Sequence, residues 1–157
     1  MGDVVDRLER REGGFSNDPD DAGGRTYKGI SETHNPDLWV DGPPSDAQVR
    51  ERYEQRYVKG PGFDQVTYAP LREQLIDYGV NSGPYVAVQK LQEILQVTVD
   101  GVLGPQTLAA LREARDTTVC NQLVAARVRM LGKIVVKNPS QLKFLNGWLN
   151  RALEFLQ

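Results

Sequence analysis

The sequence predicts a mainly α-helical domain with one small β-hairpin near its N-terminus. Apolar residues recur at helical spacing along most of the chain, whereas a single segment, 25–31, has the composition of a strand. The length of 157 residues suits a single domain, and 39% hydrophobic with 25% charged residues is typical of a folded globular protein. No apolar run approaches the roughly 18–20 residues that a membrane span requires.

The first elements are a short helix and a strand. An amphipathic helix is predicted over 3–12, and Gly13 with Gly14 ends it. Residues 17–24 are rich in Asp, Gly and Pro, which predicts turns. Residues 25–31 then predict a short strand that forms half of a small hairpin.

The middle of the chain predicts one continuous helix and then one interrupted helix. Ser45 followed by Gln48 forms a capping-box pattern, so we expect a helix of about three turns after it. Pro70 suits the first turn of the next helix. We expect that helix to break at Gly79 and to resume near Pro84.

Three further helices are predicted towards the C-terminus. Asp100 and Gly101 mark a turn, and Pro105 suits the start of the helix that follows. Thr118 is expected to cap the next helix, and Pro139 to start the last one. The last helix has an apolar stripe that consists of Leu142, Leu145, Trp148, Leu149, Ala152 and Leu156.

The composition excludes several kinds of catalysis. A single cysteine, Cys120, cannot form an internal disulfide, and a single histidine, His34, cannot lead a His-rich or Cys-rich metal site. An acidic turn that begins at Asp18 suggests calcium, but Gly29 stands where an EF-hand loop needs glutamate. We therefore expect no metal and no cofactor, so that carboxylates must carry the chemistry.

Glu12 is the carboxylate in the most unusual position. At helical spacing it lies near Val5 and Leu8, on the apolar face of its helix. Desolvation there raises the pKa of a carboxyl group, which allows it to hold and donate a proton near neutral pH. The sequence thus indicates a general acid, although a glutamate that hydrogen-bonds a neighbouring loop is an equal alternative.

Three segments together resemble a known family. The stretch from Glu12 to Ser31, EGGFSNDPDDAGGRTYKGIS, is similar to the signature of glycoside hydrolase family 108, usually EGGYxNDPxDPGGxTxYGIT. The resemblance continues in residues 77–84, and residues 100–108 resemble a peptidoglycan-binding segment. Members are N-acetylmuramidases with a lysozyme-like helical fold, found as phage endolysins and in bacterial secretion-activator loci.

The resemblance implies the organisation and the activity of the chain. It implies one lysozyme-like domain over 1–157, with a catalytic region over 1–70 and a peptidoglycan-binding-like helical region over 71–157 packed on it. The expected reaction is hydrolysis of the β-1,4 bond between N-acetylmuramic acid and N-acetylglucosamine. The alternatives are a lytic transglycosylase and a non-catalytic peptidoglycan-binding or secretion-accessory protein.

The resemblance also assigns the catalytic roles. It places the catalytic acid at Glu12. By analogy with phage-type lysozymes, Asp21 and Thr26 are the candidates for the second role, with Glu32 as a competitor. That role is either to orient the attacking water or to stabilise the developing oxocarbenium charge, and both inversion and retention of the anomeric centre stay open. Thr26 is equally explained by its strand propensity.

Three residues are predicted to bind the substrate. Lys28 stands where the family often has an aromatic residue and Tyr27 lies one place earlier, so Tyr27 is the candidate to contact sugar on the strand. Tyr78 and Asn81 lie at the predicted helix break, where an aromatic ring and an amide suit a sugar. The alternative is a tyrosine in the core and an asparagine that caps the next helix.

Charge is distributed unevenly along the chain. The net charge is −2, but residues 119–157 contain six basic side chains and one acid. The acidic remainder argues against nucleic-acid binding. The expected partner is peptidoglycan, bound by a monomer. Four basic residues are expected either to contact an anionic envelope surface or to form a solvated face: Arg127, Arg129, Lys133 and Lys137.

The first residues predict the localisation. They are charged where a signal peptide has an apolar segment. We therefore expect synthesis in the host cytoplasm and action on the cell wall in the periplasm after holin-type or particle-mediated release.

Overall fold

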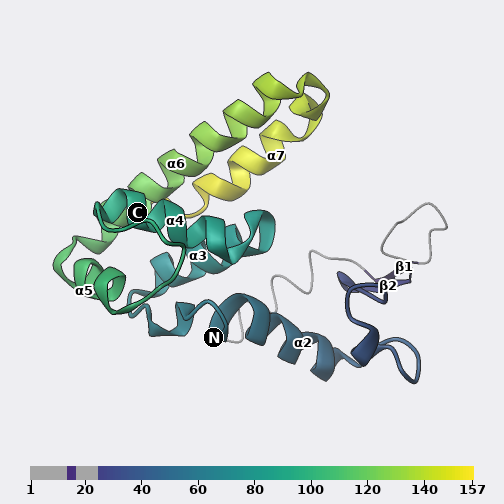
Figure 1. Cartoon of the computed structure of the whole chain (residues 1–157). Coiled ribbons are helices and arrows are strands. Elements are labelled where there is room, and N and C mark those ends of the chain that lie inside the picture. Colours follow the sequence, from purple (N-terminus) through teal and green to yellow (C-terminus); the bar gives the residue numbers. More distant parts are fainter. Residues whose placement is uncertain (1–13, 17–24) are drawn as a thin grey trace. The chain divides into compact units, whose positions relative to one another are not determined.

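The computed structural model describes residues 14–16 and 25–157, and the chain divides after Gly60 into two compact units (Figure 1). The described residues contain six α-helices and one small antiparallel sheet. The predicted mainly helical fold with an N-terminal hairpin is therefore confirmed. The helix predicted over 3–12 and the turns predicted over 17–24 lie outside the described residues.

The sheet of the first unit has three strands. They run antiparallel in the order β1 (Phe15–Ser16), β2 (Thr26–Tyr27) and β3 (Ile30–Ser31). Segment 25–31 thus supplies both strands of a hairpin, where the sequence predicted one strand. The connection is tight because Lys28 and Gly29 have φ values of 46° and 78°, and a two-residue turn with positive φ at both positions matches the twist of a hairpin.

The first unit continues with helices. A short 3₁₀ turn, η1 (Pro36–Leu38), precedes α2 (Asp46–Glu54), which runs directly into a π-helical turn, η2 (Gln55–Lys59). The predicted capping box is confirmed, because the Ser45 hydroxyl accepts a hydrogen bond from the Gln48 backbone and the Gln48 side chain accepts one from the Ser45 backbone.

The second unit is helical throughout its described elements. These are η3 (Phe63–Gln65), α3 (Ala69–Ser82), α4 (Pro84–Leu95), α5 (Pro105–Glu113), α6 (Asp116–Lys137), η4 (Pro139–Gln141) and α7 (Leu142–Leu153). The helix starts predicted from prolines are confirmed: a proline occupies the first turn of α3, α4, α5 and η4, where its missing N–H costs no hydrogen bond.

Two predicted helix boundaries were wrong. The helix α3 does not break at Gly79 but continues to Ser82, and the chain turns at Gly83 with φ of 88°. Gly79 lies beside Phe63, and a Cβ added there would be in van der Waals contact with the Phe63 ring at 3.4 Å. Thr118 does not cap α6, which begins at Asp116.

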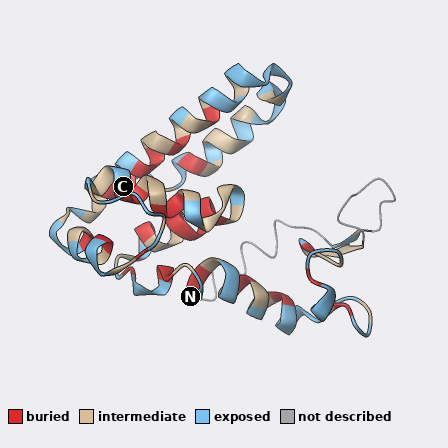
Figure 2. Ribbon diagram, in the orientation of Figure 1, coloured by how far each residue is buried: buried red, intermediate tan, exposed pale blue. Residues whose placement is uncertain are grey.

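The core of the second unit forms where α3, α4 and α6 pack on one another. Fully buried leucines from all three helices fill it, namely Leu71, Leu75, Leu91 and Leu123. Figure 2 shows buried positions concentrated there and exposed positions at the α6–α7 connection. The predicted stripe of α7 is therefore only partly covered: Ala152 is buried, whereas Leu142 is 61% exposed.

A buried glutamine organises the loop between α4 and α5. Gln92 Nε2 donates to Asp100 Oδ1 (2.7 Å) and to Thr107 Oγ1 (3.1 Å), and its Oε1 accepts from the Gly101 amide (2.8 Å). The predicted turn at Gly101 is confirmed by its φ of 73°. The hydrogen bond from Gln92 is the main reason that the pKa of Asp100 is lowered.

Candidate active site

One predicted catalytic residue, Thr26, is described by the structure. Glu12 and Asp21 lie outside the described residues. Thr26 is half-buried on β2, opposite Ser31 of β3. Successive side chains of a strand point to opposite faces, so Thr26 and the predicted sugar contact Tyr27 face opposite sides of the sheet.

The hairpin is tied to α2 through Asp46. Tyr27 Oη and Lys28 Nζ both donate to Asp46 Oδ1, each at 2.8 Å. These bonds, that from Lys28 foremost, lower the pKa of Asp46. Tyr53 Oη further along α2 donates to the Lys28 carbonyl at 3.1 Å. Lys28, which departs from the family signature, thus has two structural tasks: it forms the turn and it anchors the hairpin.

Glu32 is held by an arginine on the neighbouring strand end. Arg25 Nε donates to Glu32 Oε2 at 2.8 Å, and Arg25 Nη2 donates to Oε1 at 2.6 Å. The hydrogen bonds from Arg25 lower the pKa of Glu32. The same guanidinium lies 5.2 Å from the ring centre of the buried Trp39. A carboxylate stabilised in this way is a weak base, which makes Glu32 a poor group for activating water.

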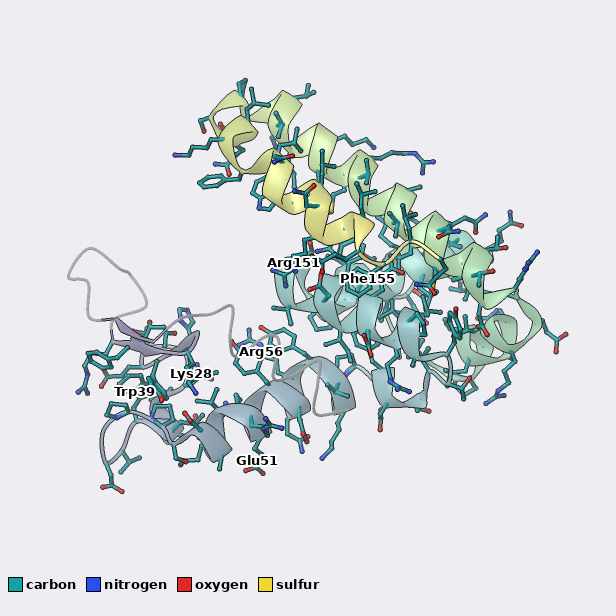
Figure 3. All side chains as sticks on the ribbon, turned by 180° about the vertical axis from the view of Figure 1, so that it is seen from behind. Lys28, Trp39, Glu51, Arg56, Arg151 and Phe155 are labelled. Carbon is teal, nitrogen blue, oxygen red and sulfur yellow. The ribbon has the colours of Figure 1, made fainter. Side chains whose placement is uncertain are left out.

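A polar cavity of about 790 Å³ lies beside α2, within the size range of ligand sites. Its lining includes His34, Asn35, Gln48, Arg52 and Arg56. Of the predicted site residues that the structure describes, none lines it. Gln48, Arg52 and Arg56 are spaced four apart, and that polar stripe is the signal by which the sequence could have revealed this face. Figure 3 labels Arg56, with Glu51, on this segment.

Tyr78 is a core residue. Its side chain has no exposed surface, its hydroxyl lies 3.3 Å from Met130 Sδ, and Arg127 lies 5.4 Å from its ring centre. Burial is the main cause that raises the pKa of Tyr78. A ring without an exposed face cannot stack on a sugar, so the predicted substrate contact is corrected to the alternative of a core tyrosine.

Asn81 is exposed at the end of α3. Its Nδ2 donates to the Asp77 carbonyl at 2.5 Å, one turn earlier in the same helix. It does not cap α4, since no side chain caps that helix. Asn81 therefore remains available to a ligand through its amide oxygen, and its predicted substrate contact stays a prediction.

Arg127 is not part of a surface patch. Its side chain is 5% exposed, and its Nη1 lies 2.7 Å from Asp77 Oδ2. The prediction that Arg127 contacts an anionic surface was wrong, because a buried and paired guanidinium cannot reach an external ligand without breaking its ion pair. Arg129, Lys133 and Lys137 are exposed along α6.

Within residues 14–16 and 25–157, no three acidic, histidine or cysteine side chains gather as a metal site would require. In the same part of the chain, none of the helices combines the length and the apolar character of a membrane span.

Comparison with known proteins identifies two families along the chain. Residues 5–83 match Glycosyl hydrolase 108, and residues 86–153 match Predicted Peptidoglycan domain. The two matches meet at the junction of α3 and α4. The compact units instead divide after Gly60. The division predicted from the sequence, after residue 70, lies between these two boundaries.

Among solved structures, the chain is similar to the one titled "Structure of Brucella abortus SagA". The sequences are 28% identical, and the TM-score is 0.68. The similarity covers 98% of this chain and 94% of that chain. No curated protein matches the sequence.

Proposed function

Because the chain belongs to the glycosyl hydrolase 108 family, and is thus a glycoside hydrolase that acts on peptidoglycan, we propose that it is an N-acetylmuramidase. It cleaves the β-1,4 bond between N-acetylmuramic acid and N-acetylglucosamine. The observation that carries the proposal is the family match over 5–83, which spans Glu12, Asp21 and the whole hairpin.

Glu12 is the proposed general acid. It donates its proton to the glycosidic oxygen as the bond from that oxygen to the anomeric carbon breaks. Water then bonds to the anomeric carbon and passes its proton to the Asp21 carboxylate, while Thr26 orients the water. Every proton is accounted for by these two carboxyl groups, so the reaction uses no cofactor.

The contacts of the hairpin support the role of Thr26. Three hydrogen bonds hold the turn that follows Thr26: Asp46 accepts two from hairpin side chains, and Tyr53 donates one to the hairpin backbone. Catalytic groups on an anchored element need little reorganisation when the substrate binds. Glu32 is engaged by Arg25, which favours Asp21 over Glu32 as the group that receives the proton from water.

The second unit supports the biological setting. Its match to a peptidoglycan domain over 86–153 indicates that the chain holds the polymer as well as cleaving it. We place the protein at the bacterial cell wall as a monomeric endolysin-type enzyme.

Replacement of Glu12 tests the proposal. Glu12→Gln keeps the shape of the side chain but removes the proton, so release of reducing ends from purified peptidoglycan should fall by at least about 10²-fold. Activity within a few-fold of wild type would show that Glu12 is not the acid. Asp21→Asn should also lower the rate, with unchanged binding to insoluble peptidoglycan.

Product analysis of the unmodified protein separates the alternatives. Hydrolysis yields reducing N-acetylmuramic acid ends. Ends that mass spectrometry identifies as 1,6-anhydro sugars would establish a lytic transglycosylase instead. Sedimentation with peptidoglycan without any soluble product would establish a non-catalytic binding protein.

A further inference from the structure

A small pocket of about 160 Å³ lies where α3, α6 and α7 meet. Its polar lining comes from Asn81, Ser82, Arg127 and Arg151, and an apolar wall that includes Ile134 and Trp148 completes it. All of the residues that line it belong to the second unit. Figure 3 shows Arg151 at the end of α7 that lies over α3.

Two arginines of the pocket share one carboxylate. Arg127 Nη1 lies 2.7 Å from Asp77 Oδ2, and Arg151 Nη2 lies 2.7 Å from Asp77 Oδ1. Arg151 Nε also donates to that Oδ1 at 2.8 Å. The pair of Asp77 with Arg127 is already neutral, so Arg151 adds a positive charge that the carboxylate cannot balance.

The arginines differ in their access to solvent. The side chains of Asp77 and Arg127 are 6% and 5% exposed, whereas that of Arg151 is 21% exposed. Arg151 therefore brings the excess charge to the mouth of the pocket. Since five N–H groups belong to each guanidinium, Arg151 has donors left for a ligand after it contacts Asp77.

The described side chains that line the pocket do not neutralise this charge. Among the described residues, no acid lines the pocket. Glu93 on α4, which acts electrostatically on Tyr78 beneath Arg127, forms its own ion pair with Lys90 at 2.7 Å. A partly desolvated cation attracts anions more strongly than one in water, because the local dielectric is lower.

We propose that this pocket binds the free carboxylate of a peptidoglycan stem peptide, with Arg151 as the cation that meets it. A guanidinium matches a planar carboxylate with two parallel hydrogen bonds. Asn81 and Ser82 offer further hydrogen bonds, and the wall with Ile134 and Trp148 suits the methyl groups of an alanine-rich peptide. The proposal rests on the proposed function only in taking peptidoglycan as the polymer.

Calorimetry with a peptide pair tests the proposal. Diacetyl-Lys-D-Ala-D-Ala carries the carboxylate, and its C-terminal amide is the matched neutral probe. The acid should bind the full chain at least about tenfold more tightly than the amide. Neither probe contains a glycosidic bond, so the result is independent of whether the protein cleaves peptidoglycan.

Two variants of basic residues on α7 test whether the carboxylate binds at Arg151. Arg151→Gln should weaken binding of the acid at least about tenfold, because Asp77 and Arg127 then form a neutral pair. Lys143→Gln removes the same charge from an exposed position of the same helix and should leave affinity within twofold. If Arg151→Gln lowers thermal stability but leaves affinity unchanged, Arg151 is only a clamp between helices and the proposal fails.

A second variant, Ile134→Phe, tests the same pocket in case Arg151→Gln does not fold. Ile134 is 38% exposed and lines the pocket, so Ile134→Phe should leave the fold intact and narrow the pocket without a change of charge. Binding of the acid beside Trp148 should change the fluorescence of that tryptophan in the wild type. Ile134→Phe should weaken the binding and abolish this change. Equal binding of acid and amide, or displacement of the peptide by inorganic phosphate at similar concentration, would overturn the assignment to a stem-peptide carboxylate.

Discussion

Arg25 donates two hydrogen bonds, of 2.8 and 2.6 Å, to the carboxylate of Glu32. They join the residue before β2 to the residue after β3. The pair closes the open end of the hairpin, opposite the turn at Lys28 and Gly29. Glu32 is therefore occupied in holding the hairpin together rather than free to act on water.

Glu32→Gln should leave catalysis nearly intact. We expect the rate of reducing-end release to stay within a few-fold of wild type, because the proposed proton acceptor is Asp21. Asp21→Asn is the matched comparison, since it makes the same change of chemistry at the other candidate. A loss of activity in Glu32→Gln as large as that in Asp21→Asn would reassign the role to Glu32.

The stabilisation from Glu32 should depend on pH. The lowered pKa of Glu32 means that the folded state prefers the ionised form. The contribution is thus complete above the ordinary glutamate pKa and disappears as the pH falls through the lowered value. Melting temperatures of wild type and Glu32→Gln should differ at pH 7 and converge in strong acid. A constant difference would contradict the pairing.

Two helical glycines should tolerate alanine. A Cβ added at Gly132 in α6 or at Gly147 in α7 meets no atom within 4 Å. Since alanine is the better helix former, each change should stabilise the protein by about 0.5–1 kcal/mol in urea unfolding. Gly101→Ala is the contrasting variant: its φ is 73° and its Cβ would lie 2.1 Å from the Tyr85 ring, so it should destabilise.

Cys120 should be unreactive in the folded protein. Its side chain is fully buried, and burial is the main cause that raises the pKa of the thiol to about 11. Little nucleophilic thiolate exists at pH 8. A disulfide reagent such as dithionitrobenzoate should react with one thiol per chain in denaturant and with almost none before unfolding. Rapid reaction with the native protein would show that the helix α6 opens locally.

Arg127 and Arg129 should behave differently although they are near neighbours on α6. Arg127→Gln removes a buried guanidinium from Asp77, which keeps Arg151 as its partner, and should cost about 1.5–3 kcal/mol of unfolding free energy. Arg129→Gln, at an exposed position, should change it by less than about 0.5 kcal/mol. Urea unfolding measures both, and similar values for the two variants would refute the burial of Arg127.

The exposed basic face of α6 is proposed to draw the protein to anionic envelope polymers or lipids. Arg129, Lys133 and Lys137 are spaced four apart and so share one face. Replacing all three with Gln should weaken binding to anionic vesicles or walls at low salt and spare activity on purified glycan. Association that keeps its strength and its salt dependence in the triple variant would show that this face is merely solvated.

Local patterns predicted much of the fold. The Ser45–Gln48 capping box, the prolines at helix starts and the turn at Gly101 all depend on residues within a few positions of one another. The predictions at Gly79 and Thr118 failed because local preference does not fix where a helix ends: α3 continues through Gly79 to Ser82, and α6 starts at Asp116 without a side-chain cap.

The candidate site was predictable only in part. The sequence by itself determined the family, through the motif from Glu12 to Ser31, and the helical class, through apolar spacing. The tertiary structure alone decided that Tyr78 is buried, that Lys28 anchors the hairpin to Asp46, and that Arg127 and Arg151 meet at Asp77. These partners are 18 to 74 residues apart. The spacing of residues in the sequence predicts which side chains share a face of one helix or strand. Which residues that face contacts depends on how the helices and strands pack.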